Sequence, residues 1–195
     1  MAQVRWLVAV DTGGALTDAV AFGPDGALRA ATGLDLSATD LIFHGTTVAT
    51  NAMLNDRLAR VVLLITEGFR DVLSYRNGTR AKVYDLEQPR PSQFVPRRDR
   101  LEGPERLSSQ DDEVIGLFKE EIGRAVQAVA ERNPVAVAVS FLFSYLDDDH
   151  ERMVADAITA RSPDLPVTRS SAIAREFREY PRTATAVVNA GLHRG

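Results

Sequence analysis

Two short apolar runs joined by a turn of glycines and acids constrain the fold more than any other feature of this chain. The runs are residues 6–10 and 19–22, and the turn between them holds two carboxylates, two hydroxyls and a Gly-Gly pair. Five consecutive apolar residues in the first run indicate a strand covered on both faces. We therefore expect the chain to begin with a β-hairpin whose turn is rich in glycine and acid.

This turn has the residue types that suit a metal-bound nucleotide. Gly13 and Gly14 let the backbone approach a ligand closely. Their N–H groups, together with the hydroxyls of Thr12 and Thr17, can donate to phosphate oxygens. Asp11 ends the first strand, where a carboxylate can hold Mg²⁺ directly or through water. The turn lacks the Lys-Ser/Thr ending of a P-loop, so it is not a Walker motif.

Two other interpretations of the turn stay open from its local pattern. Asp and Gly are common in hairpins for backbone reasons alone, and a structural turn explains the pattern about as well. Residues 11–13, Asp-Thr-Gly, are also the tripeptide that carries the catalytic carboxylate of aspartic proteases. That chemistry needs a second carboxylate sharing a proton. The protease is the weaker alternative, because the rest of the chain is mixed α/β.

The remaining chain alternates strand and helix signals. Apolar runs typical of strands lie at residues 27–32, 41–43, 60–66, 135–141 and 166–170. Helix signals lie at residues 47–57, 71–73, 108–132 and 151–161, and residues 183–190 suit either a helix or a strand. Strand, helix and strand in this order imply parallel crossovers. The predicted fold is α/β: an N-terminal β-meander followed by parallel strands with crossover helices.

A second polar cluster follows the strand at 41–43. His44 stands at the end of that strand, and Thr46, Thr47 and Asn51 lie at the start of the next predicted helix. A helix N-terminus suits an anion or a polar substrate, and a strand-end His can orient a substrate or transfer a proton. For the threonines alone, helix capping is the better explanation because it is the commoner use.

Two charged segments have a structural and a functional interpretation each. Residues 76–106 are basic, proline-rich and irregular, and they predict either a solvated loop or a surface that attracts anions. Asp147, Asp148 and Asp149 resemble a metal site. They also precede a predicted helix, whose N-terminus favours acids, so capping is the preferred interpretation.

Composition excludes several functional classes. The 195 residues include no cysteine, which excludes disulfides, thiolate metal sites and cysteine nucleophiles. The formal charge of −4 gives no basis for a nucleic-acid or membrane surface. No apolar run reaches the roughly 18–20 residues of a membrane span, and no secretory signal precedes the hairpin. We therefore expect a cytoplasmic protein of one domain, residues 1–195.

Five motifs, in order along the chain, resemble the N-terminal region of the hydantoinase A / 5-oxoprolinase family. They are residues 11–18, 44–52, 66–73, 141–145 and 176–180. The resemblance implies an actin-like, ribonuclease-H-type fold whose first hairpin grips the phosphates of ATP. It also implies Mg²⁺ and the ATP-dependent opening of a cyclic amide, such as 5-oxoproline or a hydantoin, through a phosphorylated amide oxygen.

The resemblance also assigns roles to residues. Asp11 would hold Mg²⁺ and act in catalysis, and His44 would act on the substrate. Cofactor contacts would come from Gly13, Gly14, Thr17, Asp18, Thr46, Thr47 and Asn51. The chain departs from the family in having Ala15 where Thr is usual and in its short link at 33–40. The family's C-terminal half is absent, so a second subunit or that half is the expected partner.

Three functions follow from these features. The first is the ATP-binding domain of a cyclic-amide hydrolase. The second, from the same wider family, is a subunit of an acetone- or acetophenone-type carboxylase, in which ATP activates a ketone as its enol phosphate. The third is a non-catalytic paralogue that binds a partner, which the Ala15 departure and the short link favour.

Overall fold

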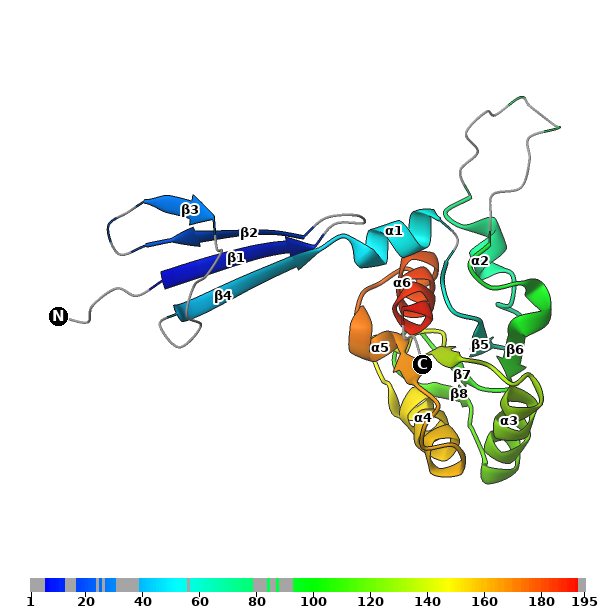
Figure 1. The fold of residues 1–195 in the computed structure, drawn as a ribbon. Coiled ribbons are helices and arrows are strands. Elements are labelled where there is room, and N and C mark those ends of the chain that lie inside the picture. Colours follow the sequence, from blue (N-terminus) through cyan, green and yellow to red (C-terminus); the bar gives the residue numbers. More distant parts are fainter. Residues whose placement is uncertain are drawn as a thin grey trace. The chain divides into compact units, whose positions relative to one another are not determined.

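The computed structural model describes residues 6–12, 17–23, 25, 27–30, 39–55, 57–78, 84, 87 and 93–192 (Figure 1). The chain divides into two compact units, Met1–Arg57 and Leu58–Gly195. Each unit has its own four-stranded sheet, so the predicted mixed α/β class is confirmed. No helix of the described part is both long and apolar enough to cross a membrane.

The first unit is a mixed sheet followed by one helix. The predicted meander is present as β1 (Trp6–Thr12), β2 (Thr17–Phe22) and β3 (Leu28–Ala30), paired antiparallel. β4 (Thr39–Thr46) pairs parallel with β1, which gives the order β3-β2-β1-β4. α1 (Val48–Leu54) follows β4, as predicted, and is shorter than the sequence indicated.

Burial in the first unit differs from the sequence expectation. In β1 only Val8 is fully buried and Ala9 is exposed, so the prediction of a strand covered on both faces is wrong. In β4 the apolar residues Leu41, Ile42 and Phe43 are 48%, 50% and 57% exposed. β4 is the last strand of its sheet and has a neighbour on one side only. Apolar character alone therefore gave the strand but not its burial.

The second unit is a parallel sheet with crossover helices, as predicted. Its strands, in the order β10-β9-β5-β6, are β5 (Val61–Thr66), β6 (Arg100–Gly103), β9 (Ala136–Ser140) and β10 (Val167–Arg169). Its helices are α2 (Val72–Tyr75), α3 (Lys119–Glu131), α4 (Asp149–Arg161), α5 (Ser170–Ile173) and α6 (Glu179–Gly191).

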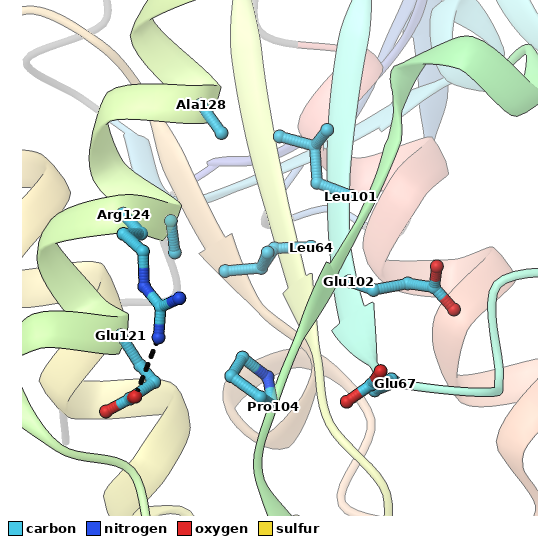
Figure 2. Close-up of a pocket in the computed structure, with 9 residues that line it drawn as sticks. Leu64, Glu67, Leu101, Glu102, Pro104, Glu121, Arg124 and Ala128 are labelled. Carbon is cyan, nitrogen blue, oxygen red and sulfur yellow. Dashed lines mark hydrogen bonds and ion pairs between the residues drawn. The ribbon is translucent and has the colours of Figure 1, made fainter.

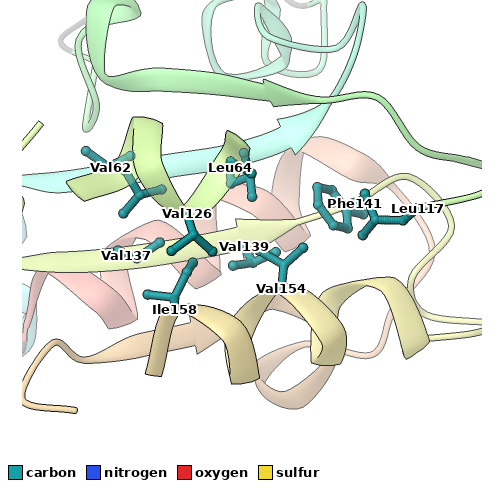
Figure 3. Packing of buried hydrophobic residues seen from close by; sticks show 11 residues of the cluster. Val62, Leu64, Leu117, Val126, Val137, Val139, Phe141, Val154 and Ile158 are labelled. Atoms are coloured by element: carbon teal, nitrogen blue, oxygen red, sulfur yellow. The ribbon is translucent and has the colours of Figure 1, made fainter. Parts of the chain in front are cut away.

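Different helices cover the two faces of this sheet. α3 and α4 pack against one face, where Val126 of α3 and Ile158 of α4 meet Val62 and Val137 of the strands (Figure 3). α2 and α6 pack against the other face, around Leu63. β5 and β9 are buried at every position. This double coverage explains why both strands are continuous apolar runs in the sequence.

The helix predicted from residue 108 begins only at Lys119. Residues before it form a hairpin of β7 (Arg106–Leu107) and β8 (Glu113–Ile115). The hydroxyl of Ser108 accepts the N–H groups of Gln110 (3.0 Å) and Asp112 (3.1 Å). The side chain that suggested a helix cap therefore stabilises a turn, which is the competing use of serine.

The basic segment at 76–106 is part of the fold from Gln93 onward, where η2 (Arg97–Asp99) leads into β6. The Arg100 side chain is fully buried and donates to the Val95 carbonyl, at 3.1 and 2.9 Å, and to Gln93 at 2.6 Å. This part of the segment differs from the solvated loop that its composition suggested. Most of residues 79–92 lie outside the described residues.

A buried carboxylate ties together the segments that follow β9 and β10. Glu151, on the first turn of α4, is fully buried. It accepts the Phe141 N–H (2.9 Å), the Ser170 hydroxyl (2.6 Å), and both the N–H (3.0 Å) and the hydroxyl (2.7 Å) of Ser171. A buried charge is tolerated only when such donors replace its lost hydration.

We predict that Glu151→Ala destabilises the chain by about 3 kcal/mol or more, because four donors lose their acceptor in a buried site. Urea denaturation measures this loss. Glu120→Ala is the matched control, since Glu120 is exposed on α3 and a surface change of this kind costs within about 0.5 kcal/mol. Equal free energies of unfolding for the two variants would contradict a stabilising role for the Glu151 hydrogen bonds.

Candidate functional site

The carboxyl ends of β1 and β4 meet at one edge of the first sheet. Their parallel register places Asp11 opposite Gly45 and Thr12 opposite Thr46. The Thr12 carbonyl accepts the Thr47 N–H at 3.1 Å and the Thr46 hydroxyl at 3.3 Å. Two segments that sequence analysis singled out separately, more than 30 residues apart, therefore form one polar edge.

Two carboxylates lie next to each other on this edge. The antiparallel register of β1 and β2 places Asp11 directly opposite Asp18. Directly opposed residues share a face of the sheet, with Cβ atoms about 4.5–5.5 Å apart. Asp11 also lies beside Gly45, because a Cβ added there would be 3.5 Å from its Oδ1 atom. Both aspartates are exposed, so this pair is open to a ligand.

The hydroxyls and the histidine lie on the opposite face. Thr12 Oγ1 is 3.1 Å from His44 Nε2, and Thr17 is the partner of Thr12 in the hairpin register. Side chains alternate between the faces of a strand, so Thr12 and His44 point away from the face that carries Asp11 and Asp18. The structure therefore brings the predicted residues to one edge but separates the carboxylates from His44.

Thr47 occupies the N-cap position of α1, as one interpretation predicted, but its side chain makes no cap hydrogen bond. Instead its hydroxyl accepts the Asn51 side-chain N–H at 3.2 Å. The predicted donors Gly13 and Gly14, and the departure at Ala15, lie outside the described residues. Their phosphate role stays a prediction.

The three consecutive aspartates at the start of α4 have protein partners. Their carboxylate oxygens lie within 4.8 Å of one another. However, Asp147 accepts the Asp149 N–H at 2.8 Å, and Asp148 pairs with Arg169 at 2.8 Å. Asp149 pairs with Arg152. Asp148 occupies the N-cap position of α4 but makes no side-chain cap hydrogen bond, so only the Asp147 contact supports the predicted capping. The ion pairs of Asp148 and Asp149 count against the metal site.

A buried chain of hydrogen-bonded side chains at the carboxyl end of β5 was not predicted from the sequence pattern. The Leu142 N–H donates to Thr66 Oγ1 at 2.8 Å, and the Thr66 hydroxyl donates to Glu105. The second oxygen of Glu105 is 3.0 Å from His150 Nδ1, and His150 Nε2 is 2.9 Å from Glu113. Only Glu113 is exposed. A histidine between two carboxylates therefore connects α4 to the β7–β8 hairpin.

We predict that this contact stabilises the chain more at about pH 6 than at about pH 8.5. The Glu105 hydrogen bond outweighs burial and, with Glu113, raises the pKa of His150 above its ordinary value. The stability it contributes is complete below the unfolded pKa of about 6.5, and is lost as pH rises through the higher folded pKa. Urea denaturation at the two pH values measures it.

His150→Gln is the control for that pH dependence. The stability difference between the parent chain and this variant should shrink as pH rises. Glu113→Gln should weaken the dependence without removing it, because Glu105 keeps its bond to His150. If the stability difference between the parent chain and His150→Gln did not change with pH, His150 would not be protonated in this contact.

A cavity of about 340 Å³ lies between α3 and strands β5 and β6 (Figure 2). Leu64 and Leu101 form its apolar floor. Glu67 and Glu102 lie on one side of it, and Glu121, paired with Arg124 at 2.8 Å, lies on the other. The excess of carboxylates repels phosphate groups, so this cavity is a poor candidate for the predicted nucleotide.

Comparisons with known proteins agree with the motifs. Residues 26–162 match the family described as Hydantoinase/oxoprolinase N-terminal region. Caprolactamase subunit alpha of Pseudomonas jessenii is 36% identical, over 78% of this chain and 22% of its own. The gamma subunit of acetophenone carboxylase from Aromatoleum aromaticum is 30% identical, over 82% of this chain and 24% of its own.

Solved structures agree with the fold. ATP-dependent caprolactamase from P. jessenii superposes with a TM-score of 0.80 at 29% identity, covering 95% of this chain and 31% of that one. Nucleotide-free acetone carboxylase has a TM-score of 0.83 at 18% identity, covering 95% and 32%. The predicted actin-like α/β fold is thereby confirmed. The chain spans a third or less of the length of these relatives.

Proposed function

Because the chain belongs to the hydantoinase/oxoprolinase N-terminal family, we propose that its first unit holds the phosphates of Mg-ATP in an ATP-dependent enzyme that opens a cyclic amide. The observation that carries this proposal is the opposed pair Asp11 and Asp18 at the open end of the first hairpin. Two relatives support the dependence on ATP, since solved caprolactamase and acetone carboxylase structures are both described as ATP-dependent.

The residues of this edge fit Mg²⁺. The ion prefers oxygen ligands and is commonly held by one or two carboxylates together with substrate phosphates. Asp11 and Asp18 supply two exposed carboxylates, and Gly45 leaves the space beside Asp11 free of a side chain. When bound, the ion would offset the negative charge of the phosphates.

The opposite face of the same edge supplies neutral donors. Thr12 and Thr17 offer hydroxyls to phosphate or substrate oxygens, and His44 orients Thr12 through their hydrogen bond. Donors fixed before the reaction stabilise developing negative charge most effectively. We assign His44 to the substrate, because the face of the sheet that it shares with Thr12 is not the face of the carboxylates.

The proposed reaction activates an unreactive amide. Transfer of the γ-phosphoryl group of ATP to the amide oxygen releases ADP and makes the amide carbon electrophilic. One water adds to that carbon and the ring C–N bond breaks, so that the nitrogen leaves as the protonated amine and the carbon remains as an acyl phosphate. A second water then hydrolyses the acyl phosphate to the carboxylate and inorganic phosphate. In such a transfer a protein contributes chiefly by positioning and charge stabilisation. The likeness to caprolactamase, an enzyme named for a cyclic amide, favours this reaction.

The carboxylase alternative shares the same activation step on a ketone oxygen, and the acetophenone carboxylase relative supports it. The full-length protein, assayed with its partner subunit, separates the two. ADP release with a lactam or hydantoin supports ring opening, and ADP release only with ketone plus bicarbonate supports the carboxylase. Binding of a partner with no ADP release under either condition supports the non-catalytic alternative.

We predict that Asp11→Asn weakens Mg-ATP binding at least about tenfold, because one charged ligand to the ion is lost. Calorimetric titration of this chain with ATP, with and without Mg²⁺, measures it. Asp25→Asn is the matched control, since Asp25 pairs with Arg29 at the β2–β3 turn. Unchanged binding by Asp11→Asn would overturn the proposal.

We predict that His44→Ala keeps Mg-ATP affinity within about twofold, since the carboxylates lie on the other face, and lowers turnover of the full-length enzyme by about 10²-fold, as for loss of a general acid or base. Calorimetry and ADP release measure the two effects. Unchanged turnover would exclude His44 from the substrate site.

A further inference from the structure

A cavity of about 390 Å³ lies in the second unit between the end of α2 and the start of α6. Its volume is within the range of small-molecule sites, about 300–1,000 Å³. Val72, Tyr180 and Pro181 contribute apolar walls, and Arg76, Arg178 and Glu179 contribute charge. Part of it belongs to the motif at residues 176–180, to which the nucleotide site gives no role.

Two arginines of this cavity have unusual backbones. Arg178 has φ 90° and ψ 118°, and Arg76 has φ 54° and ψ −133°. Among the described residues only five non-glycine positions have positive φ, and these two line the same cavity. Glycine adopts such angles at little cost, whereas arginine is strained there. Local stability therefore does not explain an arginine at position 178.

The cavity carries a net positive charge. Glu179 is paired with Arg182, a fully buried residue of α6 whose guanidinium also donates to the Phe141 carbonyl at 2.8 Å. That pairing offsets the one carboxylate in the wall. Within the described part of the chain, the Arg178 guanidinium has neither a hydrogen bond nor an ion pair. The exposed guanidinium of Arg178, with its donors in one plane, thus borders the apolar wall of the cavity.

We propose that this cavity binds a small organic carboxylate, whose carboxyl group pairs with Arg178 and whose hydrocarbon part contacts Val72 and Pro181. A guanidinium matches a carboxylate with two parallel hydrogen bonds. The apolar walls give an organic anion a contact that inorganic phosphate cannot use. The residues of this site all belong to the second unit, whereas those of the proposed nucleotide site belong to the first.

The test compares two ligands that differ only in the carboxylate. 5-Oxoproline carries it and 2-pyrrolidinone lacks it. Titration of this chain followed by NMR should show saturable shifts at Arg178 and Tyr180 with 5-oxoproline and none with 2-pyrrolidinone. Inorganic phosphate should not displace 5-oxoproline at equal concentration. Absence of saturable binding, equal binding of 2-pyrrolidinone, or displacement by phosphate would each overturn the proposal.

Arg178→Gly separates binding from folding. It should weaken 5-oxoproline binding at least about tenfold, because a charge-assisted contact is lost. It should also raise Tm by about 2–4 °C, because glycine relieves the strained φ. Arg178→Lys, which keeps the charge but loses the planar guanidinium, should bind with intermediate affinity.

Arg152→Gln, on α4 at the opposite face of the sheet, is the control for charge and should bind like the parent chain. Unchanged affinity in both Arg178 variants would overturn the site, and unchanged Mg-ATP binding in them would show that the two sites are separate.

Discussion

Parallel strand pairing is the constraint on which both units depend. A parallel ladder brings the carboxyl ends of its strands to one edge, where backbone groups leave the sheet and polar side chains can gather. In the first unit this pairing sets Asp11 beside Gly45, from segments that are remote in sequence. In the second it sets Thr66 of β5 close to the Leu142 N–H that follows β9. The same geometry thus builds an open polar edge in one unit and a buried one in the other.

The parts of the fold that follow from local pattern were predictable, and those that depend on a distant partner were not. β5 and β9 are recognisable because coverage on both faces selects continuous apolar residues. The Ser108 turn was missed because a serine before acids suits a helix cap and a turn equally well. The buried position of Arg100 depends on Gln93 and Val95 acceptors that no periodicity reveals.

The candidate site shows the same division at the level of single side chains. Asp11, Asp18 and His44 were predictable from the sequence, because their residue types and their positions near strand ends are local properties. Their division between two faces was not predictable, since the register between β1 and β4 cannot be read from either strand alone. Once that register is known, alternation along a strand assigns the carboxylates to one face and His44 to the other. This division is why the proposed function gives the carboxylates and His44 different ligands.

Buried charge in the second unit is better explained by geometry than by stability. Burying an ion costs several kcal/mol after relaxation, and apolar residues of similar size often stabilise a fold equally well. Glu151 and Arg182 nevertheless both hold the loop after β9, through the Phe141 N–H and the Phe141 carbonyl respectively. The carboxylate of Glu151 accepts from this segment and the guanidinium of Arg182 donates to it. Because hydrogen bonds are directional, the two contacts restrict the position of the segment more than apolar packing can. The loop that they fix lies directly against Glu179 and Arg182 at the start of α6, where the strained Arg178 begins the helix. A rigid backbone at this point is what allows the chain to keep an arginine in a conformation that glycine would adopt at little cost.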